Sequence, residues 1–464
     1  MPTPTIIIKE KQETRQLEVK RMAIYKQTKI VEAEDEDHQT YFVFFYKEKY
    51  LNFVTAKKIN KQSHVAMAFK KGVVFHPPHP FIETVLSSHP HFKKQSFNDL
   101  FRKLPKQSTL QETALIASYF ESFIKKEKIA ALIKSLYYQE RRDGKLLSCF
   151  RILHILKDVA PDHSLLHSYS GDMNFTKYAE RYKEGDPAIL AKDPIYVEKK
   201  MYGYKDNDQA FHKLVKLYSK EDRVVDLIAL YINRITQTKK ADDYHTLHAL
   251  IVDEFNEEDT LVILEDLYQR VPAVNPLKQT VLNTYLKLGK LKNALTLINK
   301  HKLKLKPEQS QQLTNLVKEN KSLAGEISPD GLQKLTLTLL EADDEEAADI
   351  LHLAITSLMD DHNLAAIQTW SEPLRHLPEA APVLQKVDEM AEISEDPNHQ
   401  QRLGELYHYF HQPKLAIECM SWDMELRTED PKPVHWLAKL YHEVGMEEEH
   451  KAYQQLYIDM VKRA

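Results

Sequence analysis

The C-terminal part of the chain repeats itself at a spacing of 34 residues. The triplet Glu395-Asp396-Pro397 recurs as Glu429-Asp430-Pro431, and the triplet Leu406-Tyr407-His408 returns as Leu440-Tyr441-His442. A period of this length is typical of stacked helix pairs, in which each pair buries its apolar side only against its neighbours. We therefore expect a helical array here, and such arrays commonly bind other macromolecules.

Glycine is scarce in this chain. The sequence has 10 glycines in 464 residues, whereas an average protein has roughly 7% glycine. Nucleotide-binding α/β enzymes depend on glycine for tight turns and for close approach of the backbone to phosphate. The sequence also contains no P-loop, no Gly-x-Gly-x-x-Gly and no Gly-x-Ser-x-Gly motif. We therefore expect a protein that is not an enzyme.

The two cysteines, Cys149 and Cys419, lie far apart in the sequence and predict no disulfide framework. Cys149 falls in an apolar helical pattern, so we expect it to be a small core residue. The first residues lack a basic segment followed by a long apolar run, and no stretch approaches the roughly 18 apolar residues of a membrane helix. These features predict a cytoplasmic protein without a membrane span.

Charge is distributed unevenly along the chain. Residues 1–110 contain 19 Lys and Arg against 11 Asp and Glu, whereas residues 321–464 contain 12 against 28. Such fields influence partner choice and encounter rates more than the fold. An acidic C-terminal array favours basic partner segments, and the basic N-terminal region could meet an acidic protein or a nucleic acid.

The first hundred residues contain short runs that favour β-strands, rich in aromatic and β-branched residues. We expect strands in Ala23–Tyr25, Ile30–Val31, Tyr41–Tyr46, Leu51–Thr55, Val65–Phe69 and Val73–Phe75. The segment His76-Pro77-Pro78-His79-Pro80 then interrupts regular structure, because proline lacks a backbone donor and restricts the residue before it. From about Ser96 onward the apolar pattern becomes helical.

These patterns predict a mostly α-helical chain with a small β-containing N-terminal domain. Glycine and proline between residues 168 and 208 predict an irregular joint, with short extended pieces, and the segment Ile327–Gly331 predicts a further break. The expected organisation is the β-containing domain at 1–95, a first helical-repeat block at 96–167, the joint at 168–208, a second helical-repeat block at 209–326 and an acidic block at 327–464.

The clearest single repeat unit resembles a tetratricopeptide repeat (TPR). Its matching residues are Val281, Leu282, Tyr285, Leu288, Gly289, Ala294 and Pro307, with Leu282 at the place of a small residue and Pro307 one place late. A second match comprises Leu403, Gly404, Tyr407, Phe410 and Ala416. A third comprises Leu437, Ala438, Tyr441, Val444 and Gly445, but His450 replaces its helix-B alanine. The resemblance implies an α-solenoid of TPR-like helix pairs, while the degenerate middle of the chain is also compatible with HEAT-like or other solenoids.

In the TPR family the first helix of each pair lines the concave face of the array. The resemblance therefore implies that the polar positions of these helices bind a protein or peptide partner. In the three best units these positions are Gln279, Asn283, Lys287, Gln401, Glu405, His408, His435, Lys439 and His442.

The 22 histidines of the chain raise the question of a metal site. His76 and His79 flank two prolines, and two further histidine pairs have helical spacing, His245 with His248 and His408 with His411. A zinc site needs three or four converging ligands, and two histidines on one helix supply half of that set. Met446 stands where a zinc-protease motif beginning at His442 requires its second histidine. We expect no metal, no cofactor and no catalytic residue.

Three functional hypotheses follow. The first is a non-enzymatic cytoplasmic adaptor or scaffold that binds a protein or peptide. The second is a peptide-gated regulator that resembles bacterial sensors with a TPR ligand groove. The third is nucleic-acid binding by the basic N-terminal region, where lysines alternate with aromatic residues that could stack on bases; the aromatic set is Tyr41, Phe42, Phe44, Phe45 and Tyr46.

Overall fold

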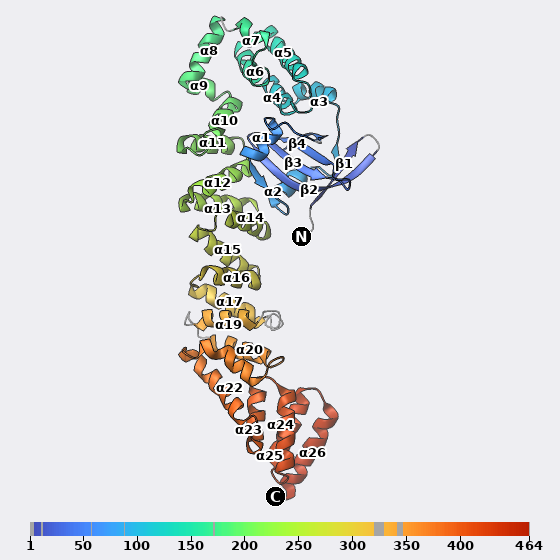
Figure 1. Cartoon of the computed structure of the whole chain (residues 1–464), viewed down its shortest axis with the longest axis vertical. Helices are drawn as coiled ribbons and strands as arrows, with labels where there is room; N and C mark the ends of the chain where they lie inside the picture. Colours follow the sequence, from blue (N-terminus) through green and yellow to red (C-terminus); the bar gives the residue numbers. More distant parts are fainter. Residues whose placement is uncertain are drawn as a thin grey trace. The chain divides into compact units, whose positions relative to one another are not determined.

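The computed structural model describes residues 4–10, 13–56, 58–87, 89–169, 172–319, 329–340 and 347–463. The chain divides into two compact units, Met1–Lys278 and Gln279–Ala464, which we call unit 1 and unit 2 (Figure 1). This division falls inside the block that we expected at 209–326. The expected boundary between residues 326 and 327 lies outside the described residues, whereas the last part of the expected break at Ile327–Gly331 belongs to a helix, Pro329–Leu340.

A seven-stranded sheet begins unit 1, with the order β5-β4-β3-β2-β1-β7 and with β6 paired to β2. Its pairs are antiparallel except for β1 with β7. The long strand β2 shares one edge between two partners, β1 along its first half and β6 near its end. The strands are β1 (Thr5–Glu10), β2 (Glu13–Tyr25), β3 (Thr28–Glu34), β4 (Thr40–Tyr46), β5 (Lys49–Thr55), β6 (Val73–Phe75) and β7 (Phe92–Lys93).

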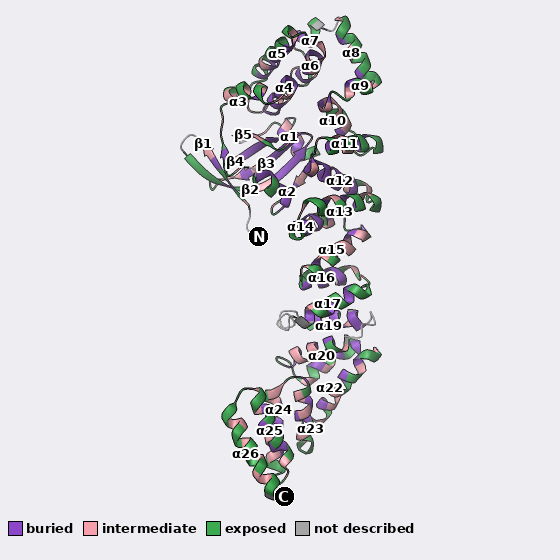
Figure 2. Ribbon diagram, turned by 180° about the vertical axis from the view of Figure 1, so that it is seen from behind, coloured by how far each residue is buried: buried purple, intermediate pink, exposed green. Residues whose placement is uncertain are grey.

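Both faces of strand β4 are buried, which explains its run of aromatic residues (Figure 2). On one face, the Phe44 ring lies 4.7 Å from the Phe120 ring. On the other face, the Phe45 ring packs edge-on against Phe92 at 5.7 Å. Successive side chains of a strand point to opposite faces, so a strand covered on both sides needs apolar residues at every position.

One of the expected strands is wrong. Val65–Phe69 belongs to helix α1 (His64–Lys71), not to a strand. The hydroxyl of Ser63 accepts a hydrogen bond from the Ala66 backbone N–H and so caps the start of the helix. Only Val65 and Ala68 of this helix are buried, a spacing of three residues that fits one helix face.

The rest of unit 1 is mostly helical. Its helices are α2 (Pro80–Ser87), α3 (Phe97–Lys103), η1 (Leu104–Lys106), α4 (Leu110–Tyr119), α5 (Lys126–Arg142), α6 (Leu146–Val159), α7 (Ser164–Tyr169), α8 (Met173–Glu184), α9 (Pro187–Leu190), α10 (Pro194–Tyr202), α11 (Asp208–Lys220), α12 (Val224–Thr238), α13 (Ala241–Glu254) and α14 (Glu257–Arg270). Helix α15 (Asn275–Lys287) spans the boundary between the units.

The expected irregular joint at 168–208 is also corrected by the structure. Its described residues form the end of α7, the helices α8, α9 and α10, and the first residue of α11. The prolines do not break these helices, because Pro187 and Pro194 each occupy a first helical turn, where no backbone donor is required. Asp186 and Asp193 precede them and cap the two helices with their carboxylates.

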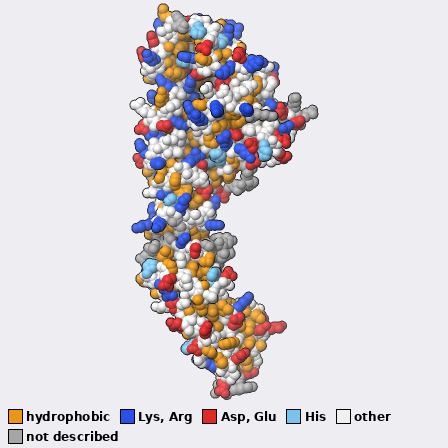
Figure 3. Space-filling view, in the orientation of Figure 1, with side chains coloured by type: hydrophobic (Ala, Val, Ile, Leu, Met, Phe, Trp, Pro, Cys, Tyr) orange, Lys and Arg blue, Asp and Glu red, His pale blue; other side chains and the backbone are white. Residues whose placement is uncertain are grey.

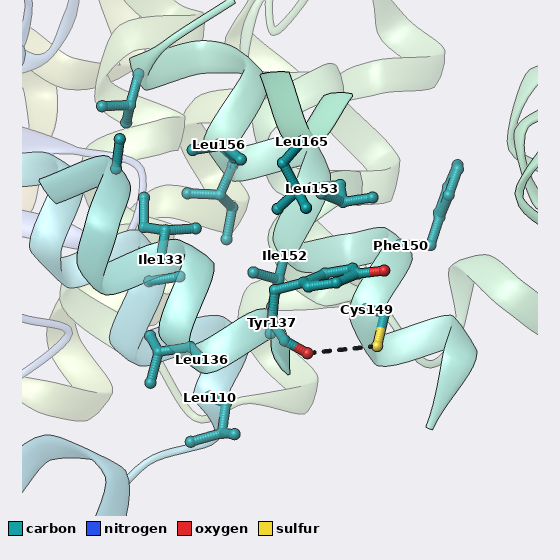
Figure 4. Close-up of a cluster of buried hydrophobic side chains, with 14 of the residues drawn as sticks. Leu110, Ile133, Leu136, Tyr137, Cys149, Phe150, Ile152, Leu153, Leu156 and Leu165 are labelled. Atoms are coloured by element: carbon teal, nitrogen blue, oxygen red, sulfur yellow. Dashed lines mark hydrogen bonds between the residues drawn. The ribbon is translucent and has the colours of Figure 1, made fainter. Parts of the chain in front are cut away.

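A hydrophobic cluster joins α4, α5 and α6 to the following helices (Figure 4). As expected, Cys149 is a core residue of this cluster. Its thiol donates a hydrogen bond of 3.7 Å to the carbonyl oxygen of Tyr137. Burial raises the pKa of the Cys149 thiol to about 11, so the reactive thiolate is disfavoured.

A buried network of charges fixes the sheet to the helices of unit 1. Arg223 donates two hydrogen bonds to the Glu198 carboxylate, at 2.7 and 3.0 Å, and a third to the carbonyl oxygen of Lys26. The Lys29 ammonium lies 2.7 Å from the Asp226 carboxylate, and both side chains are fully buried. Burial would raise the pKa of Asp226, but Arg223 and Lys29 outweigh this effect and lower it. Buried charges need such pairing to offset their desolvation.

All the regular secondary structure in the described part of unit 2 is helical. Besides the end of α15, it comprises α16 (Leu291–His301), α17 (Pro307–Glu319), α19 (Pro329–Leu340), α20 (Ala347–Leu358), α21 (Leu364–Ser371), η2 (Glu372–Leu374), η3 (Pro378–Ala380), α22 (Ala381–Ile393), η4 (Pro397–His399), α23 (Gln400–Tyr409), α24 (Pro413–Leu426), α25 (Pro431–Glu443) and α26 (Glu447–Arg463). Neighbouring helices pack in succession, α23 on α24, α24 on α25 and α25 on α26. The described chain is thus a helical-repeat-like fold preceded by a β-sheet.

Candidate functional site

The same helix-ending turn recurs in both units. In each case a residue with positive φ follows a helix, and the next N–H bonds back to a carbonyl five residues earlier, which is the Schellman motif. The positive-φ residues are Gly144, Gly185, Asp222, Gly289, Lys302, His411 and Gly445. In four of these turns the accepting carbonyl belongs to a tyrosine, at 2.8 to 3.0 Å; these are Tyr218, Tyr285, Tyr407 and Tyr441. His411 and Gly445 are one 34-residue period apart, so the sequence repeat corresponds to a repeated turn.

Helices α23 and α24 approach closely at Gly404. A Cβ atom on this glycine would lie 2.9 Å from Cε of Met420, 3.2 Å from Cβ of Cys419 and 3.3 Å from the carbonyl oxygen of Ala416. Close packing against α24 therefore explains why a small residue, Gly404, stands at this position. Next to it, Ala416 and Met420 form a core with Leu437 of α25.

Polar side chains on α23 and α25 meet at the surface of this core. The His408 ring lies 3.0 Å from the Glu443 carboxylate, and its centroid is 5.3 Å from that of Trp436. Lys439 lies over the Trp436 ring at 4.7 Å and 3.9 Å from Glu443. On α23 the amide of Gln401 donates to the Glu405 carboxylate. We call this set the α23–α25 face: Gln401, Glu405, His408, Trp436, Lys439 and Glu443.

The other two expected positions on α25 lie next to α26. The His435 ring packs against Tyr457 at 4.8 Å, and the His442 ring packs against His450 at the same separation. His442 also lies 3.3 Å from the Glu447 carboxylate. The structure therefore links His408 and Lys439 through Glu443 and Trp436, and it separately pairs Gln401 with Glu405. Two members of the α23–α25 face, Trp436 and Glu443, had been missed.

The expected positions on α15 are arranged differently. The amide of Gln309, a buried residue of α17, donates to Gln279 at 3.0 Å and to Asn283 at 2.6 Å. Gln279 and Asn283 thus link two helices of unit 2. Lys287 is exposed at the end of α15.

The aromatic residues that suggested base stacking are buried in the sheet. Tyr41, Phe42, Phe44, Phe45 and Tyr46 are at most 5% exposed. Base stacking requires an exposed ring face. The basic residues nearby, for example Lys70 and Lys71 at the end of α1, provide charge without these aromatic partners.

The histidine of the Pro-rich segment that suggested a metal is part of the core. His79 is 2% exposed, and its ring lies 4.5 Å from the Phe75 ring and 4.6 Å from the Phe81 ring. Its Nδ1 atom accepts a hydrogen bond from the Phe81 backbone N–H at the start of α2. Burial, helped by Arg270, lowers the pKa of His79 to about 3. Nowhere in the described chain do three or more His, Cys, Asp or Glu side chains gather as metal ligands would.

Within the described residues, every helix is too short or too polar to cross a membrane. The sequence matches no protein-family model, and no curated protein matches it. One solved structure with some likeness is described as a circular tandem repeat protein with novel repeat topology and enhanced subunit contact surfaces. It shares 16% identity over 78% of this chain and 70% of its own, with a TM-score of 0.08, and a score this low implies nothing about function.

Proposed function

We propose that this protein is a non-enzymatic cytoplasmic adaptor, in which TPR-like helix pairs of unit 2 form a solenoid that binds a segment of another protein. The observation that supports this proposal is the α23–α25 face. It combines partly exposed carboxylates with a half-buried tryptophan on two helices one repeat period apart. Exposed aromatic and charged residues in such a combination are typical of binding surfaces.

The chemistry of this face favours a basic segment with an apolar residue. Residues 321–464 contain 28 Asp and Glu against 12 Lys and Arg, so the surrounding field attracts cations. The contacts of Glu443 with His408 and Lys439 orient its carboxylate before a partner arrives. Preorganisation of this kind lowers the entropic cost of binding.

Exposed apolar side chains support the same conclusion. In Figure 3, hydrophobic side chains reach the surface among acidic ones over the C-terminal helices. Leu456 and Val461 on α26 are 43% and 50% exposed. These residues offer further contact area to a protein partner.

Affinity capture from a cell extract, with the full-length protein as bait, tests the proposal. The bait variant Glu405→Lys with Glu443→Lys reverses two charges on the α23–α25 face. Its matched control, Glu418→Lys with Glu425→Lys, makes the same charge change at two exposed positions of α24. We expect wild type and control to retain the same basic partner and the face variant to lose it. Equal recovery by all three baits would refute this binding face.

A further inference from the structure

Unit 1 contains a cavity of about 290 Å³ that the adaptor function does not use. Its walls come from the β2–β3 turn and from helices α1, α4, α6 and α10. Small-molecule sites begin at roughly 300 Å³ and combine apolar walls with a few placed polar groups. This cavity has apolar walls, such as Leu115 and Ile155, together with charged side chains at Lys26 and Arg151.

Three polar atoms of the lining residues are buried and have no hydrogen-bond partner among the described residues. They are the Tyr119 hydroxyl, Nη2 of Arg151 and Nε2 of His154. Tyr119 is only 3% exposed, and its ring stacks on His64 at 4.2 Å, which holds it in place. Buried polar atoms normally have partners, so three orphaned atoms around one cavity call for an explanation.

A cation in the same wall has carboxylates near it, Glu198 and Asp158, but neither forms an ion pair with it within the described residues. Lys26 lies in the β2–β3 turn, and its ammonium lies over the Tyr25 ring at 4.7 Å. No carboxylate of the described chain forms an ion pair with it. Burial, followed by the charge of Lys199, lowers the pKa of Lys26 to about 8. An anion in the cavity would offset this cost.

The carboxylates that line the cavity are already engaged. Asp193 accepts hydrogen bonds from Gln111 and Tyr182, Asp158 pairs with Lys199, and Glu121 accepts from the His64 backbone N–H. The hydrogen-bonding groups of the cavity wall that still lack a partner among the described residues are therefore mainly donors. Donors and an unpaired cation are complementary to an anion.

We propose that this cavity binds a small organic anion, with its carboxylate or phosphate group held by Lys26, Arg151 and Tyr119. The body of the ligand packs against the apolar and aromatic part of the wall. A tyrosine hydroxyl, a guanidinium nitrogen and an ammonium are all donors to oxyanions. The Nε atom of Arg151 donates to the Tyr182 hydroxyl at 3.2 Å and lies 3.5 Å from the Asp193 carboxylate, which leaves Nη2 for the anion.

Calorimetric titration of the full-length protein tests the site with phenyl phosphate, benzoate and, as a cationic control, benzylamine. We expect one of the two anions to bind with one-to-one stoichiometry and to raise the melting temperature, as linkage requires. Binding of phenyl phosphate but not benzoate would indicate that the natural ligand carries a phosphate group. Binding of benzoate but not phenyl phosphate would indicate a carboxylate. Absence of binding by both anions at about 10 mM, or equal binding of benzylamine, would overturn the proposal.

Two variants connect binding to the wall. Tyr119→Phe removes a hydroxyl that has no partner within the described residues, so the free protein should be as stable as wild type. The variant should bind the anion with about tenfold lower affinity. Lys26→Met should lower the affinity for the anion by at least the same factor. Tyr231→Phe, in a buried tyrosine outside the cavity, is the matched control and should bind like wild type. Unchanged affinity in both wall variants would show that the cavity does not hold the anion.

Discussion

Two buried basic residues of unit 1 differ in how their burial is compensated. Lys29 lies beside Asp226, at 2.7 Å, inside a network of ion pairs. His79 has one carboxylate at its edge, Asp266 at 3.9 Å, and aromatic rings around it. Its pKa consequently falls to about 3, so the imidazole is neutral in the folded protein near neutral pH.

The lowered pKa of His79 predicts a loss of stability in acid. Below its unfolded pKa of about 6.5 the unfolded chain binds a proton that the folded chain refuses, so stability falls from there down to about pH 3. His79→Asn removes this titration and retains an acceptor for the Phe81 N–H. Between about pH 7.5 and pH 5, wild type should lose ~2 kcal/mol more stability than the variant. Denaturant unfolding at both pH values measures this, and parallel losses in the two proteins would contradict it.

The charge network around Arg223 predicts a large effect of a single substitution. Arg223→Met leaves the buried Glu198 without its bidentate partner and should cost about 3–5 kcal/mol. Lys47→Met is a suitable control because the pair of Lys47 with Glu221 is partly exposed, so its loss should cost less than ~1 kcal/mol. Urea unfolding gives both values. If Arg223→Met lowered the free energy of unfolding as little as Lys47→Met does, the network would not anchor the sheet.

Gly404 provides a test of packing in unit 2. Gly404→Val adds atoms where α23 and α24 already touch, and overpacking of this kind costs about 1–3 kcal/mol. Glu425→Val on the exposed side of α24 introduces the same β-branched residue into a helix without overpacking it. A loss no greater than that of the control, measured by urea unfolding, would show that the two helices can separate at little cost.

At the scale of elements, the repeated turn explains why a glycine is found at one position and a histidine at its equivalent. Gly445 and His411 both have positive φ, at 76° and 53°. A Cβ on Gly445 would meet nothing within 4 Å, so any cost there comes from the backbone alone. Left-handed conformations cost L-residues roughly 1 kcal/mol.

These two turns therefore predict changes of opposite sign. Gly445→Ala should destabilise unit 2 by about 1 kcal/mol, and His411→Gly should stabilise it by up to about that amount. Thermal unfolding of the two variants beside wild type measures both changes. Shifts in the same direction would mean that side-chain contacts, such as that between His411 and His352, outweigh the backbone effect.

Elements with a strong local pattern could be predicted from the sequence. The aromatic run Tyr41–Tyr46 forms a strand because both of its faces are buried. The stretch Val65–Phe69 was misread because a short apolar run fits either structure. The signals that decide for a helix were present, in Ser63 as the cap and Gly72 at its end. Between residues 168 and 208, prolines at helix starts were mistaken for breaks.

At the scale of the whole molecule, the sequence predicts a mostly helical chain after a β-containing start, and the structure agrees. It could not predict sites built from distant residues. The cavity of unit 1 joins Lys26 in a turn to Lys199 on α10, and no spacing in the sequence relates them. The 34-residue period, by contrast, connects His408 with His442, but only His408 contacts Glu443 on the α23–α25 face.

The uneven charge of the chain is consistent with two binding sites of opposite preference. We propose an anion for the cavity of unit 1, where the described residues form no ion pair with Lys26, and a basic protein segment for the acidic unit 2. Because the two preferences belong to separate units, a substitution in one site should leave the other site unaffected. The variants of the α23–α25 face and of Tyr119 therefore serve as controls for each other.

Photo-crosslinking tests the adaptor function most directly. A photoreactive residue at position 439 stands beside Trp436 and Glu443, and the same residue at position 425 stands on the exposed side of α24. We predict that the full-length protein crosslinks through position 439 to a basic segment of one partner, and that position 425 does not reach it. Equal crosslinking from both positions, or none from position 439 while the partner is still captured, would contradict binding at the α23–α25 face.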